Sequence, residues 1–194
     1  TLHTDFTVPY FAAMHILAAL VERDRTGEGQ YLELSQYEAS VHLLDTELVE
    51  HLNNGTLPAR RGNQSARLAP HGVFPSAGDD QWLAIACRDD ADWTAFVKVM
   101  GDPAWANDSR FADSLNRLQH HDDLDDLIAE WTKDKEDRWV MQTLQAAGVP
   151  AGFLMDERDA YEDPQLKERG FFNQVTHEEA GTHSYPGLQW KMQN

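Results

Sequence analysis

Cysteine, basic side chains and long apolar runs are all scarce in this chain. The 194 residues include a single cysteine, Cys87, so no disulfide can form within the chain and a reducing, cytoplasmic setting is expected. The 16 Lys and Arg residues face 33 Asp and Glu residues, and the net charge of -17 argues against nucleic acid as a partner. No signal peptide and no run of about 18 apolar residues is apparent, so we expect no membrane segment.

The first 55 residues predict a helix, a strand and a second helix. Apolar residues recur at helical spacing from Val8 to Val21, with Pro9 expected in the first turn and Gly27 at the end. The alternating stretch QYLELS at 30–35 predicts a strand. Ser35 is expected to cap a second helix that buries the apolar positions from Tyr37 to Leu52 and ends at 53–55. This order is typical of an α/β layer.

Residues 56–70 and 71–194 have different patterns. The stretch 56–70 holds Pro, Gly, Asn and three Arg residues without sustained periodicity, and we interpret it as a linker. In 71–194 the apolar patterns predict a hairpin over 72–87, helices near 90–101, 124–133 and 136–147, a strand at 149–155, a short helix at 163–170 and two terminal strands. We therefore expect a small α+β domain at 71–194.

A histidine and aspartate cluster at 118–126 has the residue types of a metal site. His121 and Asp125 lie four residues apart, which is a spacing that lets two helical ligands converge. Aspartates also favour the start of a helix because of the helix dipole, and a solvated face is the commoner outcome. The sequence therefore predicts no metal site.

The linker fits two interpretations. Arg60, Arg61 and Arg67, together with Gly62, Asn63 and His71, suit either an anionic ligand or a flexible tether. No dinucleotide or P-loop motif is found in the sequence, and no G-x-S-x-G elbow surrounds Ser35, which we interpret as a helix cap. Cys87 stands in the apolar run WLAIAC, which favours a buried thiol over a reactive nucleophile.

Asp5 is the candidate catalytic residue. It precedes the predicted first helix and has no basic neighbour in sequence, while Thr7 is better placed to cap that helix. A carboxylate just beyond a helix N-terminus stays ionised because the dipole and the free N–H groups favour the anion. An ionised, partly desolvated aspartate can act as a covalent nucleophile.

Several blocks of the sequence resemble one enzyme family. They are the segment from Asp5 through ILAALVERDRTGEGQ, then RRGN at 60–63, APHGVFPSAGDDQWLAIA at 69–86, DSRF at 108–111, GVPAG at 148–152 and DPQLKERG at 163–170. In this order they resemble the class III coenzyme A transferases, the CaiB/BaiF family that includes formyl-CoA transferase. The loop after Gly62 and Asn63 reads QSARLAPHG, which differs from the glycine-rich loop of formyl-CoA transferase.

The resemblance implies a fold and an assembly. Residues 1–55 would be the end of a Rossmann-like large CoA-binding domain, 56–70 a linker, and 71–194 most of a small α+β domain. The chain would then be a partial enzyme, and its full-length form would be an interlocked homodimer.

The resemblance also implies a reaction. Coenzyme A would pass from an acyl-CoA donor to a carboxylic acid acceptor through a covalent intermediate on Asp5, without a metal, while Gly62 and Asn63 would belong to a loop over the bound coenzyme. Two alternatives remain: proton transfer as in α-methylacyl-CoA racemase, and an inactive fragment that acts as an interaction module.

Overall fold

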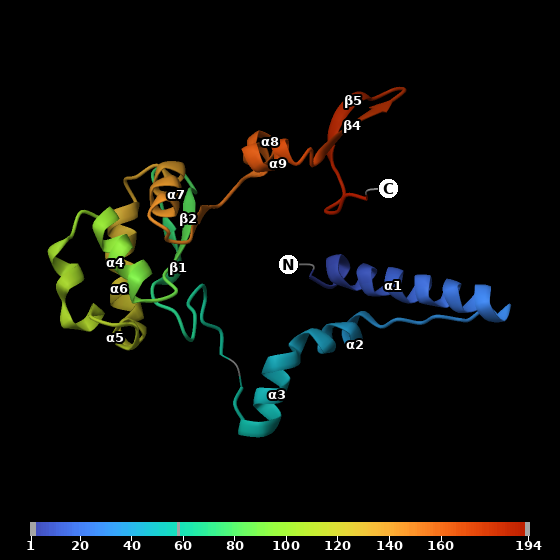
Figure 1. The fold of residues 1–194 in the computed structure, drawn as a ribbon, viewed down its shortest axis with the longest axis horizontal. Coiled ribbons are helices and arrows are strands. Elements are labelled where there is room, and N and C mark those ends of the chain that lie inside the picture. The colour runs from blue at the N-terminus through green and yellow to red at the C-terminus, as the bar shows by residue number, and fades with distance from the viewer. Residues whose placement is uncertain (1–2, 58, 193–194) are drawn as a thin grey trace. The chain divides into compact units, whose positions relative to one another are not determined.

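The computed structural model describes residues 3–57 and 59–192 and divides into two compact units, 1–60 and 61–194. Figure 1 shows the elements of both units along the chain. The boundary between the units lies inside the stretch 56–70 that the sequence predicts as a linker. Residues of 61–70 nevertheless pack on the second unit, where Ala69 and Pro70 are buried.

The first unit is helical. It contains the helices α1 (His3–Thr26), α2 (Gln36–Val41) and α3 (Asp45–Asn54), with a 3-10 turn at His42–Leu44. The Ser35 hydroxyl accepts a hydrogen bond from the Glu38 N–H, as expected of a cap. Gly55, at φ 67°, ends α3 in the left-handed conformation that glycine adopts without steric cost.

The start of α1 differs from the prediction. In the described residues the helix starts at His3, so Asp5 lies inside its first turn and Pro9 inside the helix. Thr7 is therefore not the cap, and its hydroxyl donates to the His3 carbonyl at 2.7 Å. Because proline has no N–H, the Asp5 carbonyl lacks the donor that residue 9 would otherwise supply.

The strand expected at 30–35 is not formed. Residues 31–35 have no regular secondary structure, and the described residues of the first unit contain no other strand. A strand is stable only when a neighbour pairs with its N–H and C=O groups, so alternation of side chains alone did not suffice here.

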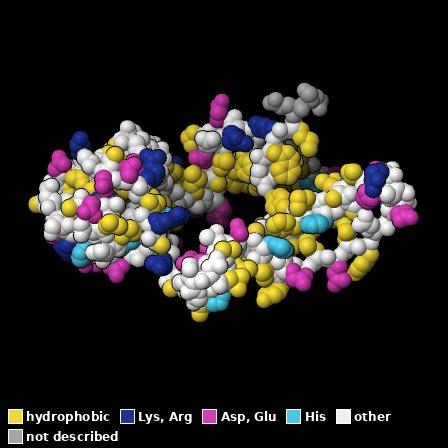
Figure 2. Space-filling model, turned by 60° about the horizontal axis from the view of Figure 1, so that its bottom comes forward, with side chains coloured by type: hydrophobic (Ala, Val, Ile, Leu, Met, Phe, Trp, Pro, Cys, Tyr) yellow, Lys and Arg dark blue, Asp and Glu magenta, His cyan; other side chains and the backbone are white. Residues whose placement is uncertain are grey.

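Apolar side chains of the first unit are exposed. Tyr37 and Leu52, which the sequence pattern assigns to a buried face, are 79% and 74% exposed, and Val8 and Ala39 are the buried apolar residues described in this unit. Figure 2 shows large apolar side chains, in yellow, on the molecular surface. The apolar spacing of these helices is amphipathic. The described residues of 1–60, however, do not cover the apolar faces of the helices.

Helix α1 bears on the expectation of no membrane segment, which stays a prediction. Its 24 residues are long and apolar enough to cross a bilayer by length and composition. A core helix of a water-soluble protein passes the same test, so composition does not assign α1 to a membrane.

The second unit is built on an antiparallel three-stranded sheet in the order β1–β2–β3. The strands are β1 (His71–Pro75), β2 (Trp82–Ala86) and β3 (Ala151–Phe153). The helices around them are α4 (Asp90–Val99), α5 (Ser114–Gln119), α6 (His121–Thr132) and α7 (Asp137–Ala146), with 3-10 turns at Ala104–Asn107 and Ser109–Phe111. The predicted hairpin is thus confirmed, with His71 opposite Ala86 and Val73 opposite Ala84.

One face of this sheet forms the hydrophobic core. Side chains alternate along each strand, and Phe74, Leu83 and Ile85 point to the same face and are at most 3% exposed. They pack with apolar residues of the helices, among them Phe96, Leu124, Ile128, Val140 and Leu144. Among the described helices of the second unit none lines the pocket on the opposite face of the sheet.

The chain ends in two short helices and a hairpin. These elements are α8 (Glu157–Glu162), α9 (Pro164–Glu168), β4 (Phe172–His177) and β5 (Gly181–Pro186). Tyr161 stacks on Phe172 with ring centroids 4.4 Å apart, and its hydroxyl donates to the Ser184 carbonyl. The predicted terminal strands and the helix at 163–170 are therefore confirmed, whereas α8 was not predicted.

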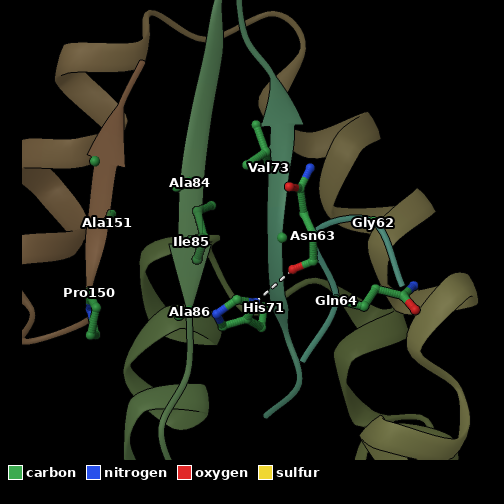
Figure 3. Close-up of a pocket in the computed structure, with 12 residues that line it drawn as sticks. Gly62, Asn63, Gln64, His71, Val73, Ala84, Ile85, Ala86, Pro150 and Ala151 are labelled. Carbon is green, nitrogen blue, oxygen red and sulfur yellow. Dashed lines mark hydrogen bonds between the residues drawn. The ribbon is translucent and has the colours of Figure 1, made fainter. Parts of the chain in front are cut away.

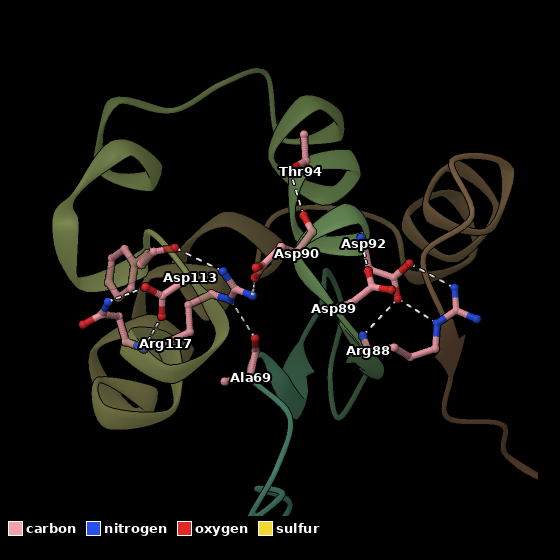
Figure 4. A network of polar contacts seen from close by, with 10 residues as sticks. Ala69, Arg88, Asp89, Asp90, Asp92, Thr94, Asp113 and Arg117 are labelled. Atoms are coloured by element: carbon pink, nitrogen blue, oxygen red, sulfur yellow. Dashed lines mark hydrogen bonds and ion pairs between the residues drawn. The ribbon is translucent and has the colours of Figure 1, made fainter.

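A buried arginine ties together three separate segments. Arg117 is 1% exposed and donates to the carbonyls of Ala69 and Phe111 and to the carboxylate of Asp90, at 2.9, 3.2 and 2.5 Å (Figure 4). Its guanidinium also lies over the Trp93 ring. Arg117 thus holds the residues leading into β1 against the start of α4 and the turn before α5.

We predict that Arg117→Met lowers the free energy of unfolding by about 3 kcal/mol, because it leaves buried carbonyl oxygens without a donor. Urea unfolding followed by circular dichroism measures the change. Arg158→Met is the matched control, since Arg158 is 93% exposed, and it should stay within about 0.5 kcal/mol of the parent. Equal effects of the two substitutions would contradict the role assigned to Arg117.

Candidate functional site

The open face of the three-stranded sheet is hollowed into a groove. This outer groove has a volume of about 560 Å³ and is lined by Gly62–Gln64, His71–Val73, Ala84–Ala86 and Pro150–Gly152. On β1 and β2 the residues that alternate with the core point outward, so Ala84 and Ala86 form the floor (Figure 3). A Cβ placed on Gly152 would meet no atom within 4 Å, which shows that small residues keep this part of the floor open.

One wall of the outer groove is the segment Gly62–Gln64. The Gln64 amide donates to Asp122 Oδ1 at 2.7 Å and to Asp125 Oδ2 at 3.1 Å, which fastens the segment to α6. The backbone carbonyl of Asn63 accepts a hydrogen bond from His71 Nδ1 at 2.7 Å. The two attachments join the segment to α6 and to His71 at the start of β1.

The first turns of α6 bring His121 close to Asp125. Burial raises the pKa of Asp125, although the hydrogen bond from Gln64 and the nearby His121 act in the opposite direction. His121 Nε2 lies 3.6 Å from Asp125 Oδ1, and neither atom has a hydrogen-bond partner. Among the residues that the structure describes, no group of three His, Cys, Asp or Glu side chains is arranged to hold a metal.

A second hollow of about 520 Å³ lies next to the outer groove. It shares Asn63 and Val73 with the groove and is otherwise lined by Asp80, Gln81, Trp82 and Leu154–Asp156. The Trp82 indole N–H donates to the Asp80 carboxylate at 2.7 Å. The backbone N–H of Asp159 lowers the pKa of Asp156, with a further contribution from Arg158, so this hollow carries negative charge at neutral pH.

The Asp5 side chain contacts the side chain of Gln36. The Gln36 amide, at the start of α2, donates to Asp5 Oδ1 at 3.2 Å, and the carboxylate is exposed. Within the described ranges no cation pairs with Asp5. Its position in the first turn of α1 puts the carboxylate near the positive end of the helix dipole.

Sequence reasoning identified some of these residues and missed others. It named Gly62, Asn63 and His71, which the structure places on one groove, whereas the three linker arginines are exposed and none lines the groove. It missed the floor residues Ala84, Ala86 and Gly152. The sequence does place small residues at alternate positions of a predicted strand. This pattern indicates the floor of a groove only once the structure shows which face of the strand points outward.

Comparison with known proteins gives the family. Residues 1–194 match the model of CoA-transferase family III over their whole length. The chain belongs to CoA-transferase family III. It is 38% identical over 181 residues to a probable CoA-transferase, Rv1866, of Mycobacterium tuberculosis, covering 91% of this chain and 22% of that protein. It is 34% identical over 165 residues to succinyl-CoA–D-citramalate CoA-transferase of Chloroflexus aurantiacus, covering 85% and 41%.

The fold agrees with this family. A crystal structure of a CaiB/BaiF family protein from Brucella suis superposes with a TM-score of 0.78 at 26% identity, over 92% of this chain and 50% of that one. The mixed helix and sheet fold expected from the resemblance is therefore confirmed, while the Rossmann-like character of the first unit stays a prediction. The chain spans half or less of the length of these family III relatives.

Cys87 is not a candidate nucleophile in this family III chain. Its thiol is 2% exposed, and burial raises its pKa to about 12, with the nearby Asp92 carboxylate adding to the rise. The thiolate, which is the reactive form, is therefore scarce at neutral pH.

We predict that a thiol-reactive disulfide reagent at about pH 8 labels the folded chain at least about 10³-fold more slowly than the urea-unfolded chain, because unfolding restores an ordinary thiol. The single cysteine makes the absorbance readout specific to this site. Rapid labelling of the folded chain would contradict the buried state of Cys87.

Proposed function

We propose that this chain provides the nucleophile and part of the substrate site of an enzyme that transfers coenzyme A from an acyl-CoA to a carboxylic acid. Membership of CoA-transferase family III supports the reaction class. The observation that carries the residue assignment is the state of Asp5, which is exposed, in the first turn of α1, and in contact with a neutral amide and no cation among the described residues. A carboxylate bound to arginine or buried under hydrocarbon would be a poor nucleophile.

In the proposed reaction Asp5 is acylated first. One of its carboxylate oxygens attacks the thioester carbonyl carbon, the C–S bond breaks, and coenzyme A leaves as a thiolate. The thiolate then attacks the Asp5 side-chain carbonyl of the mixed anhydride, which releases the donor acid and leaves a thioester between Asp5 and coenzyme A.

The second half repeats these steps with the acceptor. The acceptor carboxylate attacks the Asp5 thioester carbon and expels the thiolate, which then attacks the acceptor acyl carbon. The new acyl-CoA leaves and the Asp5 carboxylate is restored. The donor and the product are both acyl-CoA thioesters of similar energy, so the overall transfer requires no oxidant, reductant or phosphate donor.

Gln36 has a role in this scheme because it holds one oxygen of Asp5. Its amide contacts Oδ1, which leaves Oδ2 available for attack on the thioester. When a thiolate or carboxylate attacks the acylated Asp5, negative charge develops on its remaining carbonyl oxygen. A donor already aimed at that oxygen stabilises the charge, as in other acyl-transfer sites.

The reaction also needs exclusion of water, because an acyl anhydride is readily hydrolysed. The exposed apolar side chains of the first unit are surfaces that further polypeptide would cover, and the relatives are more than twice as long as the matched region. We propose that this cover comes from the remaining length found in the relatives, within a homodimer.

We predict that Asp5→Asn lowers the transfer rate at least about 10³-fold in the full-length protein, because the amide cannot form the anhydride. Hydroxylamine added during turnover of the parent should give an aspartyl hydroxamate at residue 5, found by peptide mass spectrometry. Asp24→Asn, at the exposed far end of α1, is the matched control and should leave the rate unchanged. Transfer that survives Asp5→Asn would overturn the assignment, as would deuterium exchange at the acyl Cα without any acceptor acid.

We predict that Gln36→Leu lowers kcat about 10- to 100-fold, because the oxyanion on Asp5 loses its donor. The KM for acyl-CoA should change little, since Gln36 contacts the nucleophile. Steady-state kinetics separate the two constants, and Gln36→Asn tests whether a shorter amide restores part of the rate. A rise in KM at constant kcat would assign Gln36 to substrate binding instead.

A further inference from the structure

The outer face of the three-stranded sheet is apolar. An antiparallel sheet with one face in water usually alternates apolar inward residues with polar outward residues. Here His71 is the one polar residue among the outward side chains of β1 and β2 and of Leu154, whose N–H donates to the Trp82 carbonyl. The other outward side chains are those of Val73, Pro75, Trp82, Ala84, Ala86 and Leu154. This composition is typical of a sheet that is covered on both faces.

Two hollows lie end to end along β2 on this face. The outer groove is lined by Ala84–Ala86, the second hollow by Asp80, Gln81 and Trp82, and both are lined by Asn63 and Val73. From Trp82 to Ala86 the strand runs about 14 Å, since a strand rises about 3.4 Å per residue. A helix of about nine residues has the same length. The face therefore has room for two to three turns of a helix along β2.

Most polar side chains of the two hollows are already bonded within the chain. Gln64 donates to two carboxylates of α6, His71 contacts a backbone carbonyl, and the Trp82 indole N–H donates to Asp80. A small-molecule site orients its ligand through a few polar groups that point at it. What this face mainly offers is apolar area, from Trp82, Leu154 and Met155, which are 39%, 46% and 48% exposed.

The floor between these side chains is made of small residues. Ala84, Ala86 and Gly152 form it, and Figure 3 shows Val73 and Asn63 on the side of β1. A glycine inside a strand often marks a place where another backbone approaches closely. The floor thus suits a packed segment of polypeptide.

Charge and chain length indicate which polypeptide fits. Asp80 and Asp156 line the second hollow, and the backbone N–H of Asp159 lowers the pKa of Asp156, so a basic side chain is favoured there. A second copy of residues 1–194 is a poor occupant because it also carries a net charge of -17. The matched region covers 41% of the succinyl-CoA–D-citramalate CoA-transferase and 50% of the Brucella suis chain, so half or more of each relative lies outside it.

We propose that in the full-length protein an amphipathic helix from outside residues 1–194 packs along β2 on this outer face. Its apolar side lies on Ala84, Ala86 and Gly152, and a lysine of the helix pairs with Asp80 and Asp156. The helix belongs to the same polypeptide, because an uncovered apolar face would associate non-specifically before a partner subunit arrived. This packing involves no residue of 1–60 and is independent of the chemistry at Asp5.

Photo-methionine incorporated into the full-length protein identifies the segment on this face, because Met155 lines the second hollow. After irradiation, we expect mass spectrometry to find the Met155 peptide joined to a peptide from outside 1–194. In protein reassembled from heavy- and light-isotope chains, the two joined peptides should carry the same label. Joining to residues 1–60, joining between differently labelled chains, or reaction of Met155 with solvent alone would overturn the proposal.

Gly152→Thr distinguishes a covered face from an open one by the sign of its effect. A Cβ at Gly152 would meet no atom within 4 Å, and threonine suits a strand better than glycine, so on an open face the substitution stabilises the protein. Beneath a packed helix the added side chain is too large. We expect the thermal midpoint of the full-length protein to fall by at least about 4 °C.

Ala104→Thr, at an exposed position outside both hollows, is the control and should stay within about 2 °C of the parent. A higher midpoint in Gly152→Thr would show that the face is open and would overturn the proposal. If Gly152→Thr does not fold, cross-linking of the parent still decides the question, since it needs no substitution.

Two aspartates with the same backbone conformation test the charge pairing. Asp80 and Asp102 are exposed and have φ of 53° and 52°, a conformation that asparagine also tolerates. We expect the midpoint of Asp80→Asn to lie about 2 °C below that of Asp102→Asn, because the lysine of the helix loses a partner. The difference should disappear in about 1 M salt. Equal midpoints at low salt would contradict a basic occupant.

Discussion

Burial of one face of a small antiparallel sheet is the constraint on which the second unit depends. Phe74, Leu83 and Ile85 can reach the helices only if the alternate residues point the other way. That alternation brings His71, Val73, Ala84 and Ala86 to a common outer surface. A shift of one residue in register would move the whole outward set into the core, so the groove and the core are specified together.

Arg117 gives the outer surface its wall. By bonding to the Ala69 carbonyl, it holds the chain just before β1, and the segment Gly62–Gln64 that precedes it is then secured by Gln64 and His71. A buried cation with several acceptors is costly to desolvate, and this cost is offset here by hydrogen bonds and by the partner Asp90. The result is a fixed wall made from residues whose sequence has no regular pattern.

The first unit is organised differently, because its helices have little to bury against within 1–60. Most of its large apolar side chains remain exposed, and its main long-range polar side-chain contact joins Gln36 to Asp5. The chain covers only 41% of the length of one family III relative, and we propose that such further length covers these side chains. The same feature bears on the proposed chemistry, since an acyl anhydride persists only where water is kept out.

The sequence by itself determined the second unit well: apolar periodicity located its hairpin and main helices, and the ordered motifs identified the family. It also singled out Asp5, Gly62 and Asn63 as candidates, although their roles remain to be tested. It misplaced the start of α1 and gave a strand to 30–35, because alternation of side chains does not supply a pairing partner. Only the tertiary structure decided that Ala84, Ala86 and Gly152 share a floor, that His71 contacts the Asn63 carbonyl, and that Gln64 reaches α6. Those relations depend on contacts between residues far apart in the chain, which local periodicity and spacing do not encode.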